Sequence, residues 1–181
     1  MAYYHGTNML IGAIDLSKSR MRTDFGKGFY LANMLETAQG WAARRAILSG
    51  GTPTVMRYEF KDDLFSLSGV RFASNPSTEW LEFISLNRRL SKTSLPDKEP
   101  RHEYNWVSGP IANDDIADVV DEYLEGDITS EDAIRRARAL PQTYQLSVHT
   151  LLAVQLIENE KVSYKQFKNG RWTKDWLKQN T

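Results

Sequence analysis

Two segments near the amino terminus contain the residues whose types and order could do chemistry: YHGT at 4–7 and FGKGFYLA at 25–32. Histidine is the side chain whose charge changes nearest neutral pH. His5 ends a short aromatic segment, residues 2–5, which predicts a strand that runs into a turn at Gly6 and Thr7. The glycines of the second segment indicate a turn that leads into another strand. We therefore expect His5 at the mouth of a loop.

The widespread catalytic and phosphate-binding motifs are absent. The sequence has no HExxH, no GxSxG and no complete GxGxxG. The GKG at 26–28 lacks the upstream glycine and the following Ser or Thr of a P-loop, which argues against a nucleotide triphosphatase. The three histidines, His5, His102 and His149, are too scattered to predict a metal site, and the absence of cysteine removes thiolate chemistry.

The two amino-terminal segments together resemble the first two signature strands of the ADP-ribosyltransferase superfamily, in its His-Tyr-Glu branch, which includes the poly-ADP-ribose polymerases. Those enzymes carry HG[ST] on the first strand and an FGKGIYFA-like sequence on the second. Glycine makes up about 7% of average proteins. A chance match with two fixed glycines, in the correct order after HGT, is therefore improbable.

The resemblance implies a role in binding NAD for each matching residue. His5 would hydrogen-bond a ribose hydroxyl, Gly6 would hold the nicotinamide carboxamide with its backbone, and Thr7 would occupy the small hydroxyl position. Tyr30 would stack on the nicotinamide ring, and Trp41, on the following helix, would lie against the other face of that ring.

Three further residues are candidate NAD contacts. Gly28 belongs to the second motif, where it also serves the turn geometry. Arg20 and Arg22 are candidate pyrophosphate contacts because of their charge and their closeness to the motif.

The third family signature, a glutamate at the start of a late strand, is replaced here. TYQLSVHT, residues 143–150, has Gln145 in the glutamate position. A carboxylate there stabilises positive charge on an oxocarbenium-like sugar, whereas Gln supplies only a hydrogen bond and a dipole. Three alternatives follow. The enzyme could be slow, it could use another carboxylate, with Glu79 and Glu82 as the main candidates, or the protein could bind NAD without consuming it. A second departure is Ala38, where the polymerases have a serine.

The whole chain also resembles an uncharacterised bacterial family usually placed with these transferases. The shared features are YHGS or YHGT, DFGKGFYL, a helix that contains Trp, a V-x-GP-x-AND segment (VSGPIAND, 107–114) and a late strand that begins with Gln. This resemblance makes Gln145 a family trait and favours a His-Tyr-Gln variant that still works.

Hydrophobic periodicity and turn residues predict the elements that position these side chains. Strands are expected at 54–60, 104–112 and 144–152. Helices are expected after a cap at Asn33, after Asn75-Pro76, over 114–125 and from a capping box at Thr129 to Leu140. Residues 91–103 read as an exposed connector.

Composition indicates one soluble domain over residues 1–181. Hydrophobic residues make up 41% of the chain, which is enough for a core. The 23 basic and 23 acidic residues cancel, so no global field attracts the protein to DNA or to a membrane. No apolar run could span a bilayer and no signal peptide is apparent, so we expect a cytoplasmic protein with no membrane partner.

The resemblance implies an α+β fold with two short, mainly antiparallel sheets around an NAD cleft and flanking helices. We expect a mono-ADP-ribosyltransferase in which His5, Tyr30 and Gln145 act on NAD and the acceptor is an unknown protein or nucleic acid. A toxin of this type would also have a cognate antitoxin. Two alternatives stay open: a catalytically silent NAD-binding or interaction module, and a transferase or phosphotransferase that acts on nucleic acid. The second alternative predicts that the basic carboxy-terminal residues lie beside the cleft.

Overall fold

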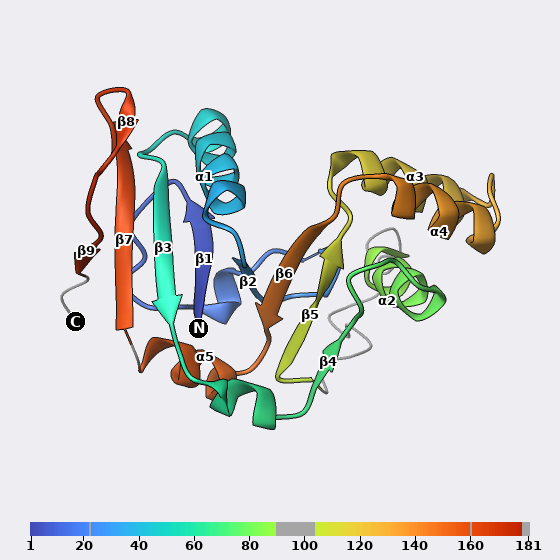
Figure 1. The fold of residues 1–181 in the computed structure, drawn as a ribbon, viewed down its shortest axis with the longest axis horizontal. Coiled ribbons are helices and arrows are strands. Elements are labelled where there is room, and N and C mark those ends of the chain that lie inside the picture. Colours follow the sequence, from blue (N-terminus) through green and yellow to red (C-terminus); the bar gives the residue numbers. More distant parts are fainter. Residues whose placement is uncertain (22, 90–103, 160, 179–181) are drawn as a thin grey trace.

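One mixed β-sheet runs through the computed structural model, which describes residues 1–21, 23–89, 104–159 and 161–178 (Figure 1). The strand order is β4-β5-β6-β2-β1-β3-β7-β8, and β9 also pairs with β7. Only β4 and β5 run parallel among the described pairs. The strands are β1 (Ala2–Thr7), β2 (Phe29–Ala32), β3 (Thr54–Glu59), β4 (Gly69–Arg71), β5 (Trp106–Ile111), β6 (Thr143–Val148), β7 (Lys161–Lys168), β8 (Arg171–Trp172) and β9 (Leu177–Lys178).

The expected α+β class is confirmed, but the expectation of two separate sheets is wrong. β1 and β2 join the two halves of the sheet, and they share a single register pair, Tyr4 with Ala32. By contrast, β1 pairs with β3 along its whole length, from Ala2 to Thr7. In Figure 1 the strands on the two sides of this seam, β3 and β7 on one and β5 and β6 on the other, lean apart. The sheet is therefore continuous but narrow where β1 meets β2.

The helices cover the sheet in three groups. They are α1 (Leu35–Ser49), α2 (Thr78–Arg89), α3 (Asp114–Glu125), α4 (Ser130–Ala139) and α5 (Leu151–Glu158), with short 3-10 turns η1 (Leu16–Lys18) and η2 (Asp62–Ser66). Buried Ala38 and Ala42 pack α1 on the strands through Val55. Helices α2, α3 and α4 share a core with β5, and α5 packs with β2, β3 and β6.

Helices α1 to α4 form where the sequence predicts helices. Ile116, Val119 and Val120 form the buried stripe of α3, which ends at left-handed Gly126. The hydroxyl of Thr129 accepts a hydrogen bond from the Asp132 amide, as a capping residue should. These two helices obey local rules, so periodicity and caps were sufficient to predict them.

Three local predictions are wrong. The strand expected over 144–152 ends at Val148, because Thr150 accepts a hydrogen bond from Ala153 and begins α5. The first turn of α2 is capped by Ser77, two residues after the expected Asn75, and Met34, not Asn33, precedes α1. The expected connector at 91–103 lies outside the described residues.

Candidate functional site

A cavity of about 530 Å³ opens at the seam between β1 and β2, within the size range of small-molecule sites. Its wall contains nearly all of the residues that the sequence singled out, contributed by β1, β2, β6, α1 and the loops before β2. These wall residues are His5, Gly6, Thr7, Arg20, Gly28, Tyr30, Trp41 and Gln145. Arg22 lies outside the described residues.

Strand register explains why residues far apart in sequence share this wall. In the antiparallel pair of β2 with β6, Tyr30 lies opposite Ser147 and Ala32 lies opposite Gln145. Opposite residues point to the same face of a sheet, so Tyr30 and Gln145 share a face. On its other side Gln145 lies opposite Gly109 of β5. The two cross-strand neighbours of Gln145 are therefore small, and Phe72 packs over Gly109.

The His5 imidazole is fixed as a neutral hydrogen-bond acceptor. Its Nδ1 lies 2.7 Å from the carbonyl oxygen of Tyr30, and its ring stacks on Phe29 with centroids 4.3 Å apart. A carbonyl only accepts, so Nδ1 carries the proton and Nε2 presents a lone pair. Burial lowers the pKa of His5 to about 4, Arg45 and Arg20 act in the same direction, and the bond to Tyr30 opposes them.

The Tyr30 hydroxyl is held by the loop that precedes β2. It donates to Thr23 or to the carbonyl of Gly26, each 2.9 Å away, and it accepts from the Phe25 amide at 2.9 Å. Burial raises the pKa of Tyr30, so the phenol stays protonated. The ring stacks on Phe25 with centroids 6.1 Å apart. Tyr30 is thus a rigid part of the wall and not a free acid or base.

The side-chain amide of Gln145 is the unusual polar group of the site. The residue is 7% exposed and lies on the cavity wall. Its amide forms no hydrogen bond with any residue that the structure describes. The amide atoms are not among the enclosed polar atoms that lack a partner, so they remain accessible from the cavity. An amide left in this state on a cavity wall is suited to a ligand that supplies both a donor and an acceptor.

Gly6 has a structural requirement of its own. A Cβ atom at this position would lie 2.1 Å from the Ala38 carbonyl oxygen and 2.9 Å from Cβ of Trp41. Only glycine therefore lets α1 approach β1 this closely, which brings Trp41 to the cavity. Trp41 and Tyr30 pack against the same apolar cluster, which includes Phe25.

Positive charge gathers on one side of the cavity. Arg20 and Arg45 both line it, and neither forms an ion pair within the described part of the chain. Partial burial lowers the pKa of Arg20, and the charges of Arg45 and Arg44 lower it further. The guanidinium of Arg44 lies 5.6 Å from the centre of the Trp41 ring. Unpaired guanidinium groups at a cavity favour a phosphate or carboxylate ligand.

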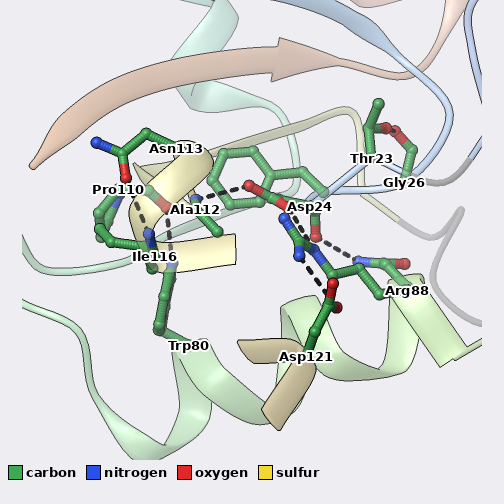
Figure 2. A network of polar contacts seen from close by, with 12 residues as sticks. Thr23, Asp24, Gly26, Trp80, Arg88, Pro110, Ala112, Asn113, Ile116 and Asp121 are labelled. Atoms are coloured by element: carbon green, nitrogen blue, oxygen red, sulfur yellow. Dashed lines mark hydrogen bonds and ion pairs between the residues drawn. The ribbon is translucent and has the colours of Figure 1, made fainter. Parts of the chain in front are cut away.

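Asp24 connects the motif loop to the helical side of the molecule (Figure 2). Its carboxylate accepts hydrogen bonds from Nε of Arg88 at 2.9 Å and from the Ala112 amide at 2.7 Å. Arg88 also lies 3.5 Å from Asp121 of α3. Burial raises the pKa of Asp24, which the adjacent guanidinium opposes. The DFGKGFYL and VSGPIAND segments are thus joined by a direct contact.

Among the residues that the structure describes, no free carboxylate on the cavity wall takes the place of the glutamate that Gln145 replaces. Of the described carboxylates, Asp15 and Asp24 line the cavity. Asp24 is paired with Arg88, and Asp15 accepts hydrogen bonds from the amide and hydroxyl of Ser17. Glu79 and Glu82 are exposed on α2 and are not part of this wall. The prediction that one of these two glutamates serves the site therefore has no support.

Sequence reasoning missed several residues of the wall. Arg45 follows Trp41 by four positions, a spacing that places both on one face of α1 and could have predicted it. Arg88 and residues 8–15 also line the cavity, and no motif marks them. Ala38 is buried on the same wall, whereas Thr37 is not part of it.

Three further features concern metal binding, the position of His149 and membrane insertion. Within the described ranges, no three His, Asp or Glu side chains are grouped so as to hold a metal ion. His149 lies outside the wall, with Nδ1 3.0 Å from the Lys27 carbonyl oxygen. None of the described helices combines the length and apolar character needed to cross a membrane.

The chain matches a known protein family over most of its length. Residues 1–159 match a family described as a protein of unknown function, DUF3990. Because the match covers most of the chain, the protein belongs to the DUF3990 family. No curated protein and no solved structure matches the chain. Strands β7, β8 and β9 lie beyond the matched residues.

Proposed function

We propose that this protein is an NAD-dependent mono-ADP-ribosyltransferase with an ADP-ribosyltransferase-like fold. The observation that carries the proposal is the amide of Gln145, which no described residue pairs, on the wall of the same cavity as His5, Gly6 and Tyr30. The family resemblance of the two amino-terminal motifs suggests NAD as the ligand that would satisfy this amide.

The chemistry of the wall fits the parts of NAD. The aromatic rings of Tyr30 and Trp41 suit a flat nicotinamide. Nε2 of His5 and the amide of Gln145 can accept from and donate to ribose hydroxyls. Arg20 and Arg45 suit the pyrophosphate, because guanidinium groups pair with phosphate through parallel hydrogen bonds.

The proposed reaction breaks the bond between C1′ of the ribose and the nicotinamide nitrogen. The electron pair stays with nitrogen, so nicotinamide leaves as a neutral molecule. A nucleophile on the acceptor bonds to C1′ and releases its proton to solvent. Gln145 can orient the ribose and offer its carbonyl dipole to the developing positive charge. Without a full negative charge, we expect a slow reaction.

A silent NAD-binding module is the second candidate, and one observation favours it. Both carboxylates on the cavity wall, Asp15 and Asp24, are already engaged by other groups. The positive charge of an oxocarbenium-like sugar would then be stabilised by dipoles such as the Gln145 amide, without a free carboxylate. Such a protein would bind NAD and leave it intact.

The test is nicotinamide release from NAD by the purified protein, compared with three variants. We expect slow release by the wild type, loss in His5→Ala and a faster rate in Gln145→Glu, because a carboxylate stabilises the transition state better than an amide. Gln155→Glu is the matched control, since Gln155 is exposed on α5. Binding without release in the wild type would favour the silent module, and neither binding nor release would refute both candidates.

A further inference from the structure

The carboxy-terminal strands form a hairpin at the edge of the sheet (Figure 1). Asn169 and Gly170 connect β7 to β8, and both have positive φ angles, 52° and 76°. This pair of left-handed residues forms the tight two-residue turn that matches the twist of a hairpin. The hairpin is therefore a defined structural element and not a loose tail.

The segment that forms the hairpin carries a strong positive charge. Residues 161–178 contain six basic residues and one acidic residue, in a chain whose net charge is zero. Lys168 and Arg171 lie directly opposite each other on β7 and β8. Like charges in this position destabilise a strand pair. Lys168, Arg171 and Lys174 form no ion pair with the described residues, so local acidic groups do not compensate the repulsion.

Aromatic rings lie among these charges. Phe167 and Trp172 are the adjacent cross-strand pair, with an edge-to-face contact at 5.6 Å between centroids. Phe167 is 39% exposed, so part of its ring is accessible beside these charges. Trp172 forms part of a hollow of about 500 Å³, whose other lining residues are Lys168, Asn169, Arg171, Thr173, Lys174, Asp175 and Leu177, three of them basic and one acidic.

Both tryptophans of this segment, Trp172 and Trp176, are half-buried and pack against the apolar cluster of Ala32, Ala38, Ala42 and Val55, and Trp176 makes further contacts. It stacks on Tyr4 at 5.9 Å, and the guanidinium of Arg57 and the ammonium of Lys165 lie 5.3 and 5.2 Å from its ring. Trp176 therefore anchors the segment to the sheet. Tyr4 also lines the cavity at the β1–β2 seam, so the hairpin adjoins that cavity without contributing to its wall.

We propose that this hairpin binds single-stranded nucleic acid. Lys168, Arg171 and Lys174 would contact phosphates, and a base would stack on Trp172 in the hollow. Cationic grooves with exposed aromatic rings are how proteins bind single strands, because every unpaired base offers a flat face. A duplex hides these faces, and an acidic peptide lacks them. The remainder of the chain carries net negative charge, so the hairpin stands out by its positive charge. Arg20 and Arg45 belong to the separate cavity at the β1–β2 seam. The proposal is independent of NAD.

Fluorescence anisotropy of labelled oligonucleotides tests the proposal. The probes are twelve-residue oligo-uridylate and oligo-thymidylate, a twelve-base-pair DNA duplex, and polyglutamate of similar charge. We expect both single strands to bind, with affinity falling about tenfold or more between 50 and 200 mM salt for three phosphate contacts. The duplex and polyglutamate should bind at least tenfold more weakly. Comparison of oligo-uridylate with oligo-thymidylate shows whether the hairpin prefers RNA or DNA as its ligand.

Variants separate stacking from charge. We expect Trp172→Ala to weaken binding about tenfold, with Trp172→Phe retaining most of it. A Lys168→Gln/Arg171→Gln/Lys174→Gln protein should lose binding. The matched control, Lys61→Gln/Arg135→Gln/Arg138→Gln, removes the same charge outside residues 161–178, at three exposed positions, and should bind as the wild type does. Circular dichroism checks that each variant is folded.

Three results would overturn the proposal. The first is no binding of either single strand at 50 mM salt. The second is equal binding of duplex, single strand and polyglutamate, which would indicate a nonspecific attraction of anions. The third is unchanged binding in the hairpin triple variant. Because NAD binding is measured separately on the same proteins, failure here leaves the proposed transferase function standing.

Discussion

The proton on Nδ1 of the His5 imidazole links strand β1 to strand β2 and also sets which ring nitrogen faces the cavity. Its Nδ1 hydrogen bond to the Tyr30 carbonyl spans the seam where the β1–β2 ladder has a single register pair. The same bond fixes the tautomer and leaves Nε2 as an acceptor at the cavity. A histidine with a pKa of about 4 stays neutral throughout the physiological range, so it can accept a hydroxyl proton but is not a general acid.

The depressed pKa of His5 predicts a pH dependence of stability. The unfolded chain takes up a proton near pH 6.5, whereas the folded chain does so near 4. Stability from this group is therefore fully present above pH 6.5 and is lost as the pH falls toward 4, by about 1 to 3 kcal/mol. Urea unfolding of the wild type and His5→Gln at several pH values measures it. A constant difference between the two proteins from pH 7 to pH 4 would contradict the assignment.

Gly6 gives a second prediction at the residue scale. The methyl group of Gly6→Ala would meet the Ala38 carbonyl oxygen, so α1 must move away from β1. We expect a loss of about 1 to 3 kcal/mol in the free energy of unfolding and weaker ligand binding, because Trp41 moves with the helix. Gly12→Ala is the control, since Gly12 has open space around it. Equal stability of the two variants in urea unfolding would show that the close approach is not required.

The sequence predicted the motif residues of the cavity wall but not the residues whose contacts hold them in place. His5, Gly6 and Tyr30 lie in short segments whose glycines and aromatics are recognisable without a structure. The partner of the Tyr30 hydroxyl and the pairing of Asp24 with Arg88 depend on contacts 5 to 64 residues apart. Such contacts follow from packing, for which the sequence carries no periodic pattern.

At the scale of elements, Asp24 organises the side of the cavity formed by helices. It holds Arg88 of α2 and the amide that precedes α3, and its own carbonyl accepts from Asn87 at 2.9 Å. The next residues of the same loop hold the Tyr30 hydroxyl. A displacement of α2 relative to β5 would therefore reach the aromatic wall through this loop.

Asp24→Asn tests this connection. It leaves the largely buried guanidinium of Arg88 without its closest carboxylate, so we expect a loss of about 3 kcal/mol in unfolding free energy. Asp132→Asn is the matched control, because its pair with Arg135 is exposed and screened by water, and it should have a much smaller effect. Equal effects in urea unfolding would mean that the Asp24 network does not hold the loop.

Helices with a regular apolar stripe and clear end residues were predictable from the sequence. Elements whose position depends on pairing or packing with distant segments were not. Helix α3 has a regular apolar stripe and a glycine end, so its bounds follow from sequence. Strand β4 is three residues long and gains its place by parallel pairing with β5, which no local pattern indicates. Helix α5 was missed because its alternating apolar residues continue the pattern of β6, and only the Thr150 cap separates them.

At the scale of the whole molecule, the fold separates two surfaces. The cavity lies at the narrow seam of the sheet, between halves that share one register pair, and a ligand there would contact both. The basic hairpin lies at the outer edge, beyond the residues matched by the family, and its tryptophans pack near the cavity through Tyr4 and the cluster of Ala32 and Ala38. Net neutrality of the sequence concealed this division, because opposite charges in different regions cancel.

Calorimetric titration of NAD into the wild type, Gln145→Ala and Gln155→Ala tests the central claim most directly. We predict saturable binding by the wild type and by Gln155→Ala, and at least tenfold weaker binding by Gln145→Ala, because its amide supplies hydrogen bonds that no described residue uses. Absence of binding by the wild type, or equal affinity in all three proteins, would contradict the claim that this cavity is an NAD site.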